Sequence, residues 1–162
     1  MYAQDRDLSL DEIKEHLNNG DSYVMRVRSK GDPNKTVEID DLIKGKLRFG
    51  ERNLDDVLLK KDGTPTYHLA HVVDDHFMRT THVIRDDGWV SSIPLHIELF
   101  NLLGWELPKY AHIAPITIKD KETGAIRKLS KRKDPWAGAK FYEESRIPLG
   151  ALRLYLATIT IS

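Results

Sequence analysis

The sequence predicts an α/β protein, and three observations carry this prediction. After Pro65, short apolar strands alternate with helical patterns, an order that is typical of a parallel sheet covered by helices. Before residue 62 the pattern is one helix followed by short alternating strands, which predicts a small α+β unit. Apolar residues make up 40% and charged residues 31% of the 162 positions, which is the composition of a globular protein rather than a disordered one.

The first predicted element is a helix that begins after Ser9. Ser9 and Glu12 have the spacing of a capping box, in which each side chain bonds to the other residue's backbone N–H. Apolar residues then recur at helical spacing as far as Leu17, and Gly20 suits the left-handed residue that ends a helix. We therefore expect a short helix that begins after Ser9 and ends before Gly20.

Four short strands are predicted in the rest of the first unit. Residues 23–28 and 36–40 alternate between apolar and polar side chains, and a turn lies between them, so we expect the two to pair as a hairpin with a long loop. Residues 46–49 and 56–60 are predicted to form two more strands.

In the second unit, which follows Pro65, helices and strands are predicted to alternate. Residues 67–75 are apolar on one helical face, and residues 81–85 form a buried type of strand. A helix is expected over residues 94–103, with Ser92 as its cap and Gly104 just past its end.

The predicted elements continue to the C-terminal end. A strand is expected over residues 111–116 and helices over residues 137–144 and 149–156, while the stretch from 119 to 133 is strongly charged.

The charge balance and the absence of cysteine exclude several classes of protein. Lys and Arg number 25, as do Asp and Glu, which excludes a globally cationic nucleic-acid binder but leaves room for a local basic patch. Without cysteine there is no disulfide scaffold, thiol nucleophile or thiolate zinc site. No apolar run approaches the roughly 20 residues that span a bilayer, and the polar N-terminal residues do not have the pattern of a signal peptide. We therefore expect a cytoplasmic protein with no membrane partner.

A cluster of histidines and carboxylates begins at His68. On a helix, His68, His71 and Asp75 lie near one face, and imidazole and carboxylate groups suit Zn²⁺ or Mn²⁺. The spacing matches no metalloprotease signature. Two interpretations stay open at this point: a metal site, or histidines that are satisfied by neighbouring protein groups.

A second cluster, residues 85–89, follows a predicted strand directly. In an open parallel sheet, ligands bind outside the carboxyl ends of the strands. Arg85 could hold a carboxylate with two parallel hydrogen bonds, and Trp89 could supply a stacking wall. The alternative is a solvated turn with a buried tryptophan.

A third cluster is the basic run from Arg127 to Lys133, which has five cations in seven residues. Such a run is commonly a solvated loop. The alternative is contact with a polyphosphate or a nucleic-acid backbone, and the hydroxyl of Ser130 between the cations suits phosphate.

Six segments in collinear order carry a resemblance. They are Pro65–Ala70, Val72–His76, Thr81–Arg85 with Trp89 and Ser91–Ser92, Leu103–Glu106, Pro108–His112 and Lys128–Arg132. Together they resemble the bacterial glutamyl-tRNA synthetases, which are class I aminoacyl-tRNA synthetases. The last segment looks like the K-M-S-K-S loop of that family, with Leu129 for Met and Arg132 for the final Ser.

The resemblance implies a division of the chain into three parts. Residues 1–62 would be part of the α+β insert that binds the tRNA acceptor stem, and residues 63–140 the second half of the Rossmann-type catalytic domain with its parallel sheet. Residues 141–162 would begin the stem-contact helices.

The resemblance also implies a reaction and two groups of site residues. In this family, the α-carboxylate of glutamate attacks ATP to give glutamyl-adenylate and pyrophosphate, and the acyl group then passes to the terminal adenosine of tRNA. Arg85 would pair with the side-chain carboxylate of glutamate. The residues implied for the glutamate and adenylate pocket are Tyr67, His71, Arg85 and Trp89. The residues implied to neutralise the phosphates are Lys128, Ser130 and Lys131.

The implied partners are glutamate, ATP and the acceptor end of tRNA. Mg²⁺ would accompany ATP, held mainly by phosphate oxygens, and we expect no metal bound by the protein itself.

Three departures from the family pattern bear on function. The H-I-G-H signature of the first Rossmann half does not occur in the sequence, His71 stands where most members have Asn, and Gly88 stands where an acidic residue is usual. We therefore expect this segment by itself to be inactive, and to associate through an exposed sheet edge. Two rival hypotheses are a non-catalytic module that binds the tRNA acceptor, and a metal-dependent hydrolase that uses His68, His71 and Asp75.

Overall fold

The computed structural model describes residues 2–121 and 123–160. Met1 and residues 161–162, at the outer limits of the first and third predicted segments, lie outside the described residues, as does Glu122 of the charged stretch.

The largest sheet has four strands in the order β3-β2-β6-β5. Their bounds are β2 Thr36–Asp41, β3 Gly45–Gly50, β5 His82–Asp86 and β6 Lys109–Ile113. Strands β5 and β6 run parallel, as do β2 and β6, whereas β2 and β3 form an antiparallel hairpin. The predicted α/β class with a parallel sheet is confirmed.

This sheet joins parts of the chain from both sides of residue 62. Asp41, at the end of β2, lies in register with Tyr110 of β6. The domain limits at residues 62 and 140 remain predictions, but the β2–β3 hairpin packs as part of the parallel sheet.

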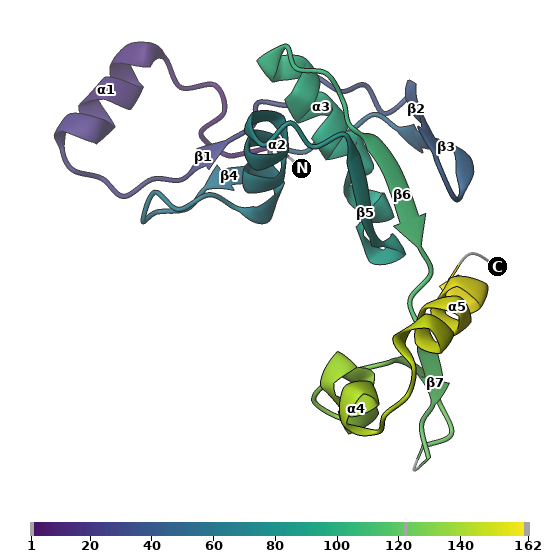
Figure 1. The fold of residues 1–162 in the computed structure, drawn as a ribbon. Coiled ribbons are helices and arrows are strands. Elements are labelled where there is room, and N and C mark those ends of the chain that lie inside the picture. Colours follow the sequence, from purple (N-terminus) through teal and green to yellow (C-terminus); the bar gives the residue numbers. More distant parts are fainter. Residues whose placement is uncertain (1, 122, 161–162) are drawn as a thin grey trace.

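Two helices of the second unit supply the core. Helix α2, Tyr67–Phe77, and helix α3, Ile93–Leu103, confirm the two predicted helices. The central cluster is formed by five buried side chains: Val27, Val72, Leu95, Leu99 and Phe100. Burying such a cluster is the main term that holds α2 and α3 in place, and Figure 1 shows both helices beside β5 and β6.

The start of α3 differs from the prediction. Ser92 makes no capping hydrogen bond, because it is the last residue of a 3₁₀ helix, η1 (Asp87–Ser92), that continues directly into α3. The cap is instead one helix earlier, where the Asp86 side chain accepts a hydrogen bond from the Gly88 backbone N–H. The predicted end is confirmed, since Gly104 adopts a left-handed conformation with φ of 69°.

The predicted pairing of residues 23–28 with 36–40 is wrong. Strand β1, Met25–Arg26, pairs with β4, Val57–Leu59, while β2 pairs with β3 across a short turn. The turn is preset locally, because the Asp41 carboxylate accepts the backbone N–H groups of Ile43 and Lys44. A short turn orders fewer residues than the long loop from 29 to 35 and therefore loses less chain entropy.

Helix α1, Leu10–Asn18, confirms the first prediction, including both hydrogen bonds of the capping box between Ser9 and Glu12. In Figure 1 it lies apart from the sheet, at the end of an extended arm. None of its residues is buried.

The C-terminal part contains a hairpin that the sequence prediction missed. Strands β7 (Thr117–Lys119) and β8 (Ile126–Lys128) pair within the charged stretch. The 3₁₀ helix η2 (Pro135–Ala137), α4 (Ala139–Glu144) and α5 (Leu149–Thr160) follow. In Figure 1, β7, α4 and α5 lie beyond the C-terminal end of β6. Within the described residues, every helix is too short or too polar to cross a bilayer.

Candidate functional site

The guanidinium group of Arg85 is the centre of the site. Arg85 lies near the carboxyl end of β5, beside His112 of β6, at the sheet edge where ligands bind in such folds. Its Nε donates a hydrogen bond to Nε2 of His112 at 2.9 Å, and its Nη1 donates to the Tyr67 hydroxyl at 3.3 Å. Its Nη2 lies 3.3 Å from Nδ1 of His96. Among residues 2–121 and 123–160, no carboxylate pairs with Arg85, so its positive charge is available to an acidic ligand.

Two half-exposed aromatic rings form a wall beside Arg85. Tyr67 is the first residue of α2 and Trp89 belongs to η1, and their ring centroids are 4.1 Å apart. The structure therefore brings together three of the four predicted pocket residues, Tyr67, Arg85 and Trp89, from three different elements.

The fourth predicted pocket residue, His71, is buried beneath this wall. Its Nδ1 lies 2.5 Å from the Asp75 carboxylate and its Nε2 lies 3.0 Å from the Tyr110 hydroxyl. Burial lowers the pKa of His71 despite the neighbouring Asp75. Because a carboxylate only accepts, Nδ1 carries the hydrogen and Nε2 accepts from the Tyr110 O–H. Both ring nitrogens are thus engaged by protein groups, and contact with a ligand remains a prediction.

The remaining histidines of the cluster bond to one another. Nδ1 of His68 lies 3.0 Å from Nε2 of His96, on α3. Burial lowers the pKa of His68, and burial lowers that of His96 to about 2. Within the described residues, no group of three or more histidine and acidic side chains is arranged to hold a metal ion. The metal interpretation of His68, His71 and Asp75 therefore has no geometric support in that part of the chain.

Four residues around Arg85 were not predicted: His96, Tyr110, His112 and Asp41. Tyr110 lies beneath the Arg85 guanidinium, 5.0 Å from it, and is stacked with His112. Burial raises the pKa of Tyr110. A signal was present, because residues two apart on a strand share one face and Tyr110 and His112 are two apart on the strand next to Arg85. Asp41 gave no such signal, since its contact spans 71 residues of sequence.

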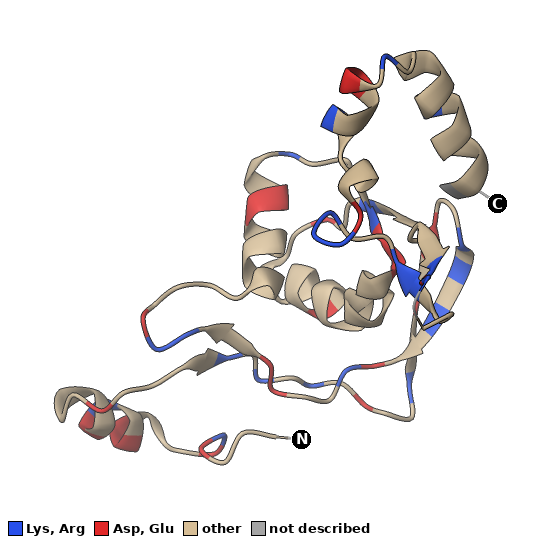
Figure 2. Ribbon diagram, turned by 90° about the horizontal axis from the view of Figure 1, so that it is seen from below, with Lys and Arg blue, Asp and Glu red and all other residues tan. Residues whose placement is uncertain are grey.

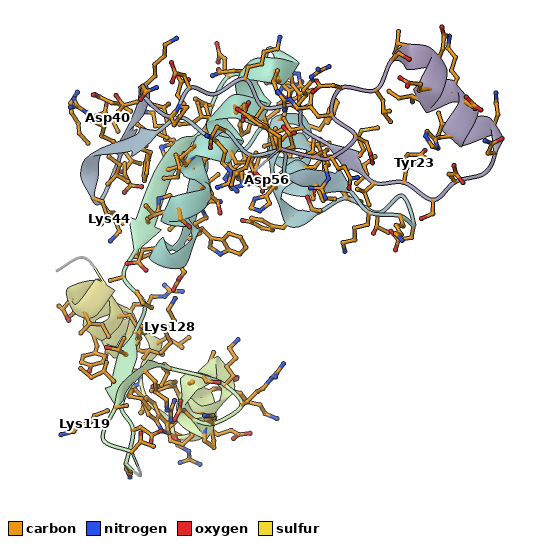
Figure 3. The ribbon with its side chains drawn as sticks, turned by 180° about the vertical axis from the view of Figure 1, so that it is seen from behind. Tyr23, Asp40, Lys44, Asp56, Lys119 and Lys128 are labelled. Atoms are coloured by element: carbon orange, nitrogen blue, oxygen red, sulfur yellow. The ribbon has the colours of Figure 1, made fainter. Side chains whose placement is uncertain are left out.

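The first lysine of the basic run, Lys128, contacts the turn after Arg85. Its Nζ lies 2.7 Å from the Asp86 carboxylate, and Figure 3 shows it at the junction between the sheet and the C-terminal elements. The hydrogen bond from Lys128 lowers the pKa of Asp86. A Cβ atom on Gly88 would lie 2.7 Å from the same carboxylate, so the glycine leaves room for this ion pair.

Two carboxylates hold Arg127 at the start of the basic run: Asp120, which accepts a hydrogen bond from Nε at 2.8 Å, and the buried Asp134. Asp134 accepts two hydrogen bonds from Arg127, at 2.7 and 2.8 Å, and one from the Ser130 backbone N–H at 2.9 Å. The hydrogen bonds from Arg127 lower the pKa of Asp134 to about 2. Lys131 is exposed, and in the described ranges no acidic side chain pairs with it. A short loop of the ribbon is almost wholly blue in Figure 2, which matches the three consecutive cations 131–133.

Two cavities lie elsewhere in the molecule. One of about 390 Å³ is lined by residues at the C-terminal ends of α2 and α3, including Arg79 and Trp105. The other, of about 300 Å³, lies between Arg52 and α3. Neither is lined by a predicted site residue, so the predicted site coincides with neither cavity.

Comparison with protein families identifies a match to the catalytic domain of the class I tRNA synthetases (E and Q), over residues 2–162. A glutamate–tRNA ligase of Acetivibrio thermocellus is 50% identical over 158 residues, covering 98% of this chain and 29% of the relative. One of Clostridium beijerinckii is 48% identical over 161 residues, covering 99% of this chain and 29% of the relative. The chain therefore spans under a third of the length of these relatives.

Solved structures give the same match. The glutamate tRNA ligase of Elizabethkingia meningosepticum, in complex with its amino acid, is 40% identical with a TM-score of 0.65. That of Elizabethkingia anophelis is 38% identical with a TM-score of 0.64. Each comparison covers 77% of this chain and 24% of the other.

Proposed function

The chain belongs to the catalytic-domain family of the class I tRNA synthetases (E and Q), and on this premise we propose that it supplies the glutamate and adenylate side of a glutamate–tRNA ligase. The proposed reaction is ATP-dependent. The α-carboxylate of glutamate attacks the α-phosphorus of ATP, the bond to pyrophosphate breaks, and glutamyl-adenylate forms. The terminal adenosine of tRNA then takes the acyl group and AMP leaves.

The observation that carries the proposal is the unpaired charge of Arg85. Within the part of the chain that the structure describes, its guanidinium is held by uncharged groups of Tyr67, His96 and His112, which use three of its five N–H groups and leave its charge without a counter-ion. A carboxylate is the ligand that matches the remaining donors. We assign Arg85 to the side-chain carboxylate of glutamate, with Tyr67 and Trp89 as the wall against which substrate packs.

The basic run from Arg127 to Lys133, called the lysine loop from here on, would bind the phosphates of ATP. Lys131, with Lys128 and Ser130 nearby, would neutralise the charge that builds up on the oxygens of ATP as pyrophosphate leaves. Lys128 would have to leave Asp86 to do so, which requires movement of the β7–β8 hairpin or of its own side chain.

Mg²⁺ would enter with ATP rather than with the protein. Phosphate oxygens would be its main ligands.

The test is ATP–pyrophosphate exchange in a graft, in which this chain replaces the matching segment of the Acetivibrio thermocellus ligase. We expect exchange that depends on glutamate and is not supported by aspartate. The isolated 162-residue segment should show none. A folded graft that binds tRNA but does not exchange pyrophosphate would overturn the proposal in favour of the non-catalytic tRNA-acceptor module.

Self-association through the sheet is a separate part of the proposal. In the described part of the chain β5 has a neighbour on one side only, and Ile84 on it is 67% exposed. Unpaired apolar edges favour pairing with a second copy. Sedimentation at millimolar concentration should reveal dimers, and a strictly monomeric profile would contradict this part. The cytoplasmic location also remains a prediction.

A further inference from the structure

A buried Asp–His pair lies directly behind Arg85. Nδ1 of His112 is 2.6 Å from Oδ2 of Asp41, and neither side chain has any exposed surface. On its other side, Nε2 of His112 accepts the hydrogen bond from Nε of Arg85 at 2.9 Å, the shortest of the three that the guanidinium makes within the described residues.

The partners of His112 determine where its hydrogen lies. A carboxylate only accepts hydrogen bonds and a guanidinium only donates them. His112 must therefore carry its hydrogen on Nδ1, toward Asp41, and present the lone pair of Nε2 to Arg85. A histidine of the other tautomer would point an N–H at the Nε–H of Arg85, and that contact is repulsive.

Asp41 is itself held rigidly. Its carboxylate accepts the backbone N–H groups of Ile43, Lys44 and His112. Burial raises the pKa of Asp41, but the hydrogen bonds from the Lys44 backbone and the His112 side chain outweigh burial, so its pKa lies below the ordinary value. The group is therefore a carboxylate at neutral pH, and its orientation is fixed by the turn between β2 and β3.

We propose that Asp41 and His112 are positioning residues that aim the guanidinium of Arg85, and that they thereby set the preference for a substrate carboxylate over a carboxamide. The inference rests on the assignment of Arg85 to the glutamate side chain. It connects a residue of the first 62 positions to substrate choice, although Asp41 itself does not reach the substrate face.

Orientation affects selectivity because the two candidate side chains differ in their hydrogen bonds. A carboxylate accepts at both oxygens, whereas the carboxamide of glutamine presents an NH₂ group to a guanidinium that can only donate. The mismatch excludes glutamine only while Arg85 is held in place. If Arg85 can turn away, both substrates bind weakly and selectivity falls.

Two substitutions at His112 separate orientation from packing. In His112→Gln, the amide oxygen can occupy the place of Nε2 and still accept from Arg85. In His112→Asn, the shorter side chain can still donate to Asp41 but cannot reach Arg85. Both variants remove the ring and both keep an amide, so a purely structural role predicts similar losses for the two.

A third substitution acts one step further from the site. In Asp41→Asn, the amide oxygen must remain at the turn to accept from Ile43 and Lys44, so the NH₂ group faces His112 and favours the wrong tautomer. The matched control is Asp40→Asn on the neighbouring residue, whose side chain is 79% exposed and 3.7 Å from Lys46. Figure 3 labels both Asp40 and Lys44 on this hairpin.

The experiment measures exchange in the graft with glutamate and with glutamine. For His112→Asn and Asp41→Asn we expect KM for glutamate to rise about 10- to 100-fold, the loss of one hydrogen bond to a charged group. The glutamate-to-glutamine selectivity should fall by a similar factor, while KM for ATP stays within about 2-fold. His112→Gln should keep KM for glutamate within about 3-fold, and Asp40→Asn should have no effect.

The outcomes separate the two proposals. An unaltered, folded graft with no exchange contradicts the proposed function itself. An active graft in which His112→Asn and His112→Gln behave alike, or in which KM for ATP rises together with KM for glutamate, overturns the positioning role. If His112→Asn fails to fold in a thermal melt, Asp41→Asn decides, and unchanged selectivity in that variant overturns the inference.

Discussion

The Arg85 cluster and the lysine loop are two cationic regions of one molecule, and they are built in opposite ways. Around Arg85, the partners come from β5, β6, α2 and α3, and the groups that hold it are mostly buried. In the loop, the order depends on two carboxylates that hold Arg127, Asp120 and Asp134, and on the exposed ion pair between Lys128 and Asp86. Lys131 extends into solvent.

The difference indicates how the two regions would work. A cation fixed by uncharged neighbours keeps its charge and its direction, so it can choose among ligands before any reaction occurs. An exposed cation is screened by water and salt and contributes fully only when it closes over its ligand. We infer that the amino-acid side of the site is formed in advance and that the phosphate side is completed by substrate.

The largest predicted effect is at Arg85. Arg85→Ala in the graft should lower kcat/KM for glutamate on the order of 100- to 1,000-fold, because it removes the charge that we propose binds the substrate carboxylate. Arg85→Lys keeps the charge but not the forked donors, so its kcat/KM for glutamate should lie between those of the unaltered graft and Arg85→Ala. Arg79→Ala, on an exposed residue at the other end of α2, is the control. Equal losses in all three variants would contradict a specific role for Arg85.

The second predicted effect is at Lys131, and it distinguishes the role of the lysine loop from that of the Arg85 cluster. Lys131→Ala should lower kcat about 100-fold, the typical loss of one group that stabilises developing charge, and leave KM for glutamate unchanged. Lys119→Ala, on the exposed strand β7, should leave both constants unchanged. A raised KM for glutamate in Lys131→Ala would mean that the two regions are not independent.

The third effect is a pH dependence of stability in the cluster. Burial lowers the pKa of His96 to about 2, from an ordinary value of 6.5. Between these values the unfolded chain binds a proton that the folded chain does not, so the free energy of unfolding should fall as pH drops below 6.5. The slope approaches about 1.4 kcal/mol per pH unit for each such group.

Urea unfolding at pH 7, 6 and 5 measures this slope. His96→Asn removes the titrating group, and it should make the slope shallower even if it lowers stability at pH 7. His68 and His71, whose pKa values burial also lowers, should add to this slope, whereas His16, whose pKa is raised by its hydrogen bond with Asp21, should oppose it. Stability that rises on acidification over this range would contradict the buried, neutral state of the cluster.

The smallest effect concerns the loop alone. Asp134→Asn weakens the hydrogen bonds to Arg127 and Ser130, so trypsin should cleave between residues 127 and 133 several times faster. KM for glutamate should not change. Glu143→Gln, on the exposed face of α4, is the control. An unchanged cleavage rate would show that Asp134 does not hold the loop.

Local signals predicted most of the secondary structure. Two helix ends are confirmed: the capping box at Ser9 and Glu12, and the left-handed Gly104. Both are set by hydrogen bonds within a few residues. The predicted partner of residues 23–28 is wrong, because strand pairing depends on turns and on contacts with residues that are distant in the sequence. The prediction that Ser92 caps α3 is wrong, because the 3₁₀ helix that precedes α3 has no distinct sequence signal.

The candidate site divides in the same way. Tyr67, Arg85 and Trp89 were identified by resemblance to a known family, and the structure gathers them. His71 was assigned to the same pocket, but Asp75 and Tyr110 engage both of its ring nitrogens. Asp41 could not be predicted, since its function depends on a contact across 71 residues that only the fold creates.

The most direct test of the account is a titration of the 162-residue chain with a non-hydrolysable glutamyl-adenylate analogue, followed by tryptophan fluorescence. Trp89 lies in the proposed pocket, so its emission should report binding. A preformed amino-acid side predicts saturable binding that is lost in Arg85→Ala and kept in Lys131→Ala. No binding up to millimolar analogue by a folded chain would contradict the claim that the site is formed in advance.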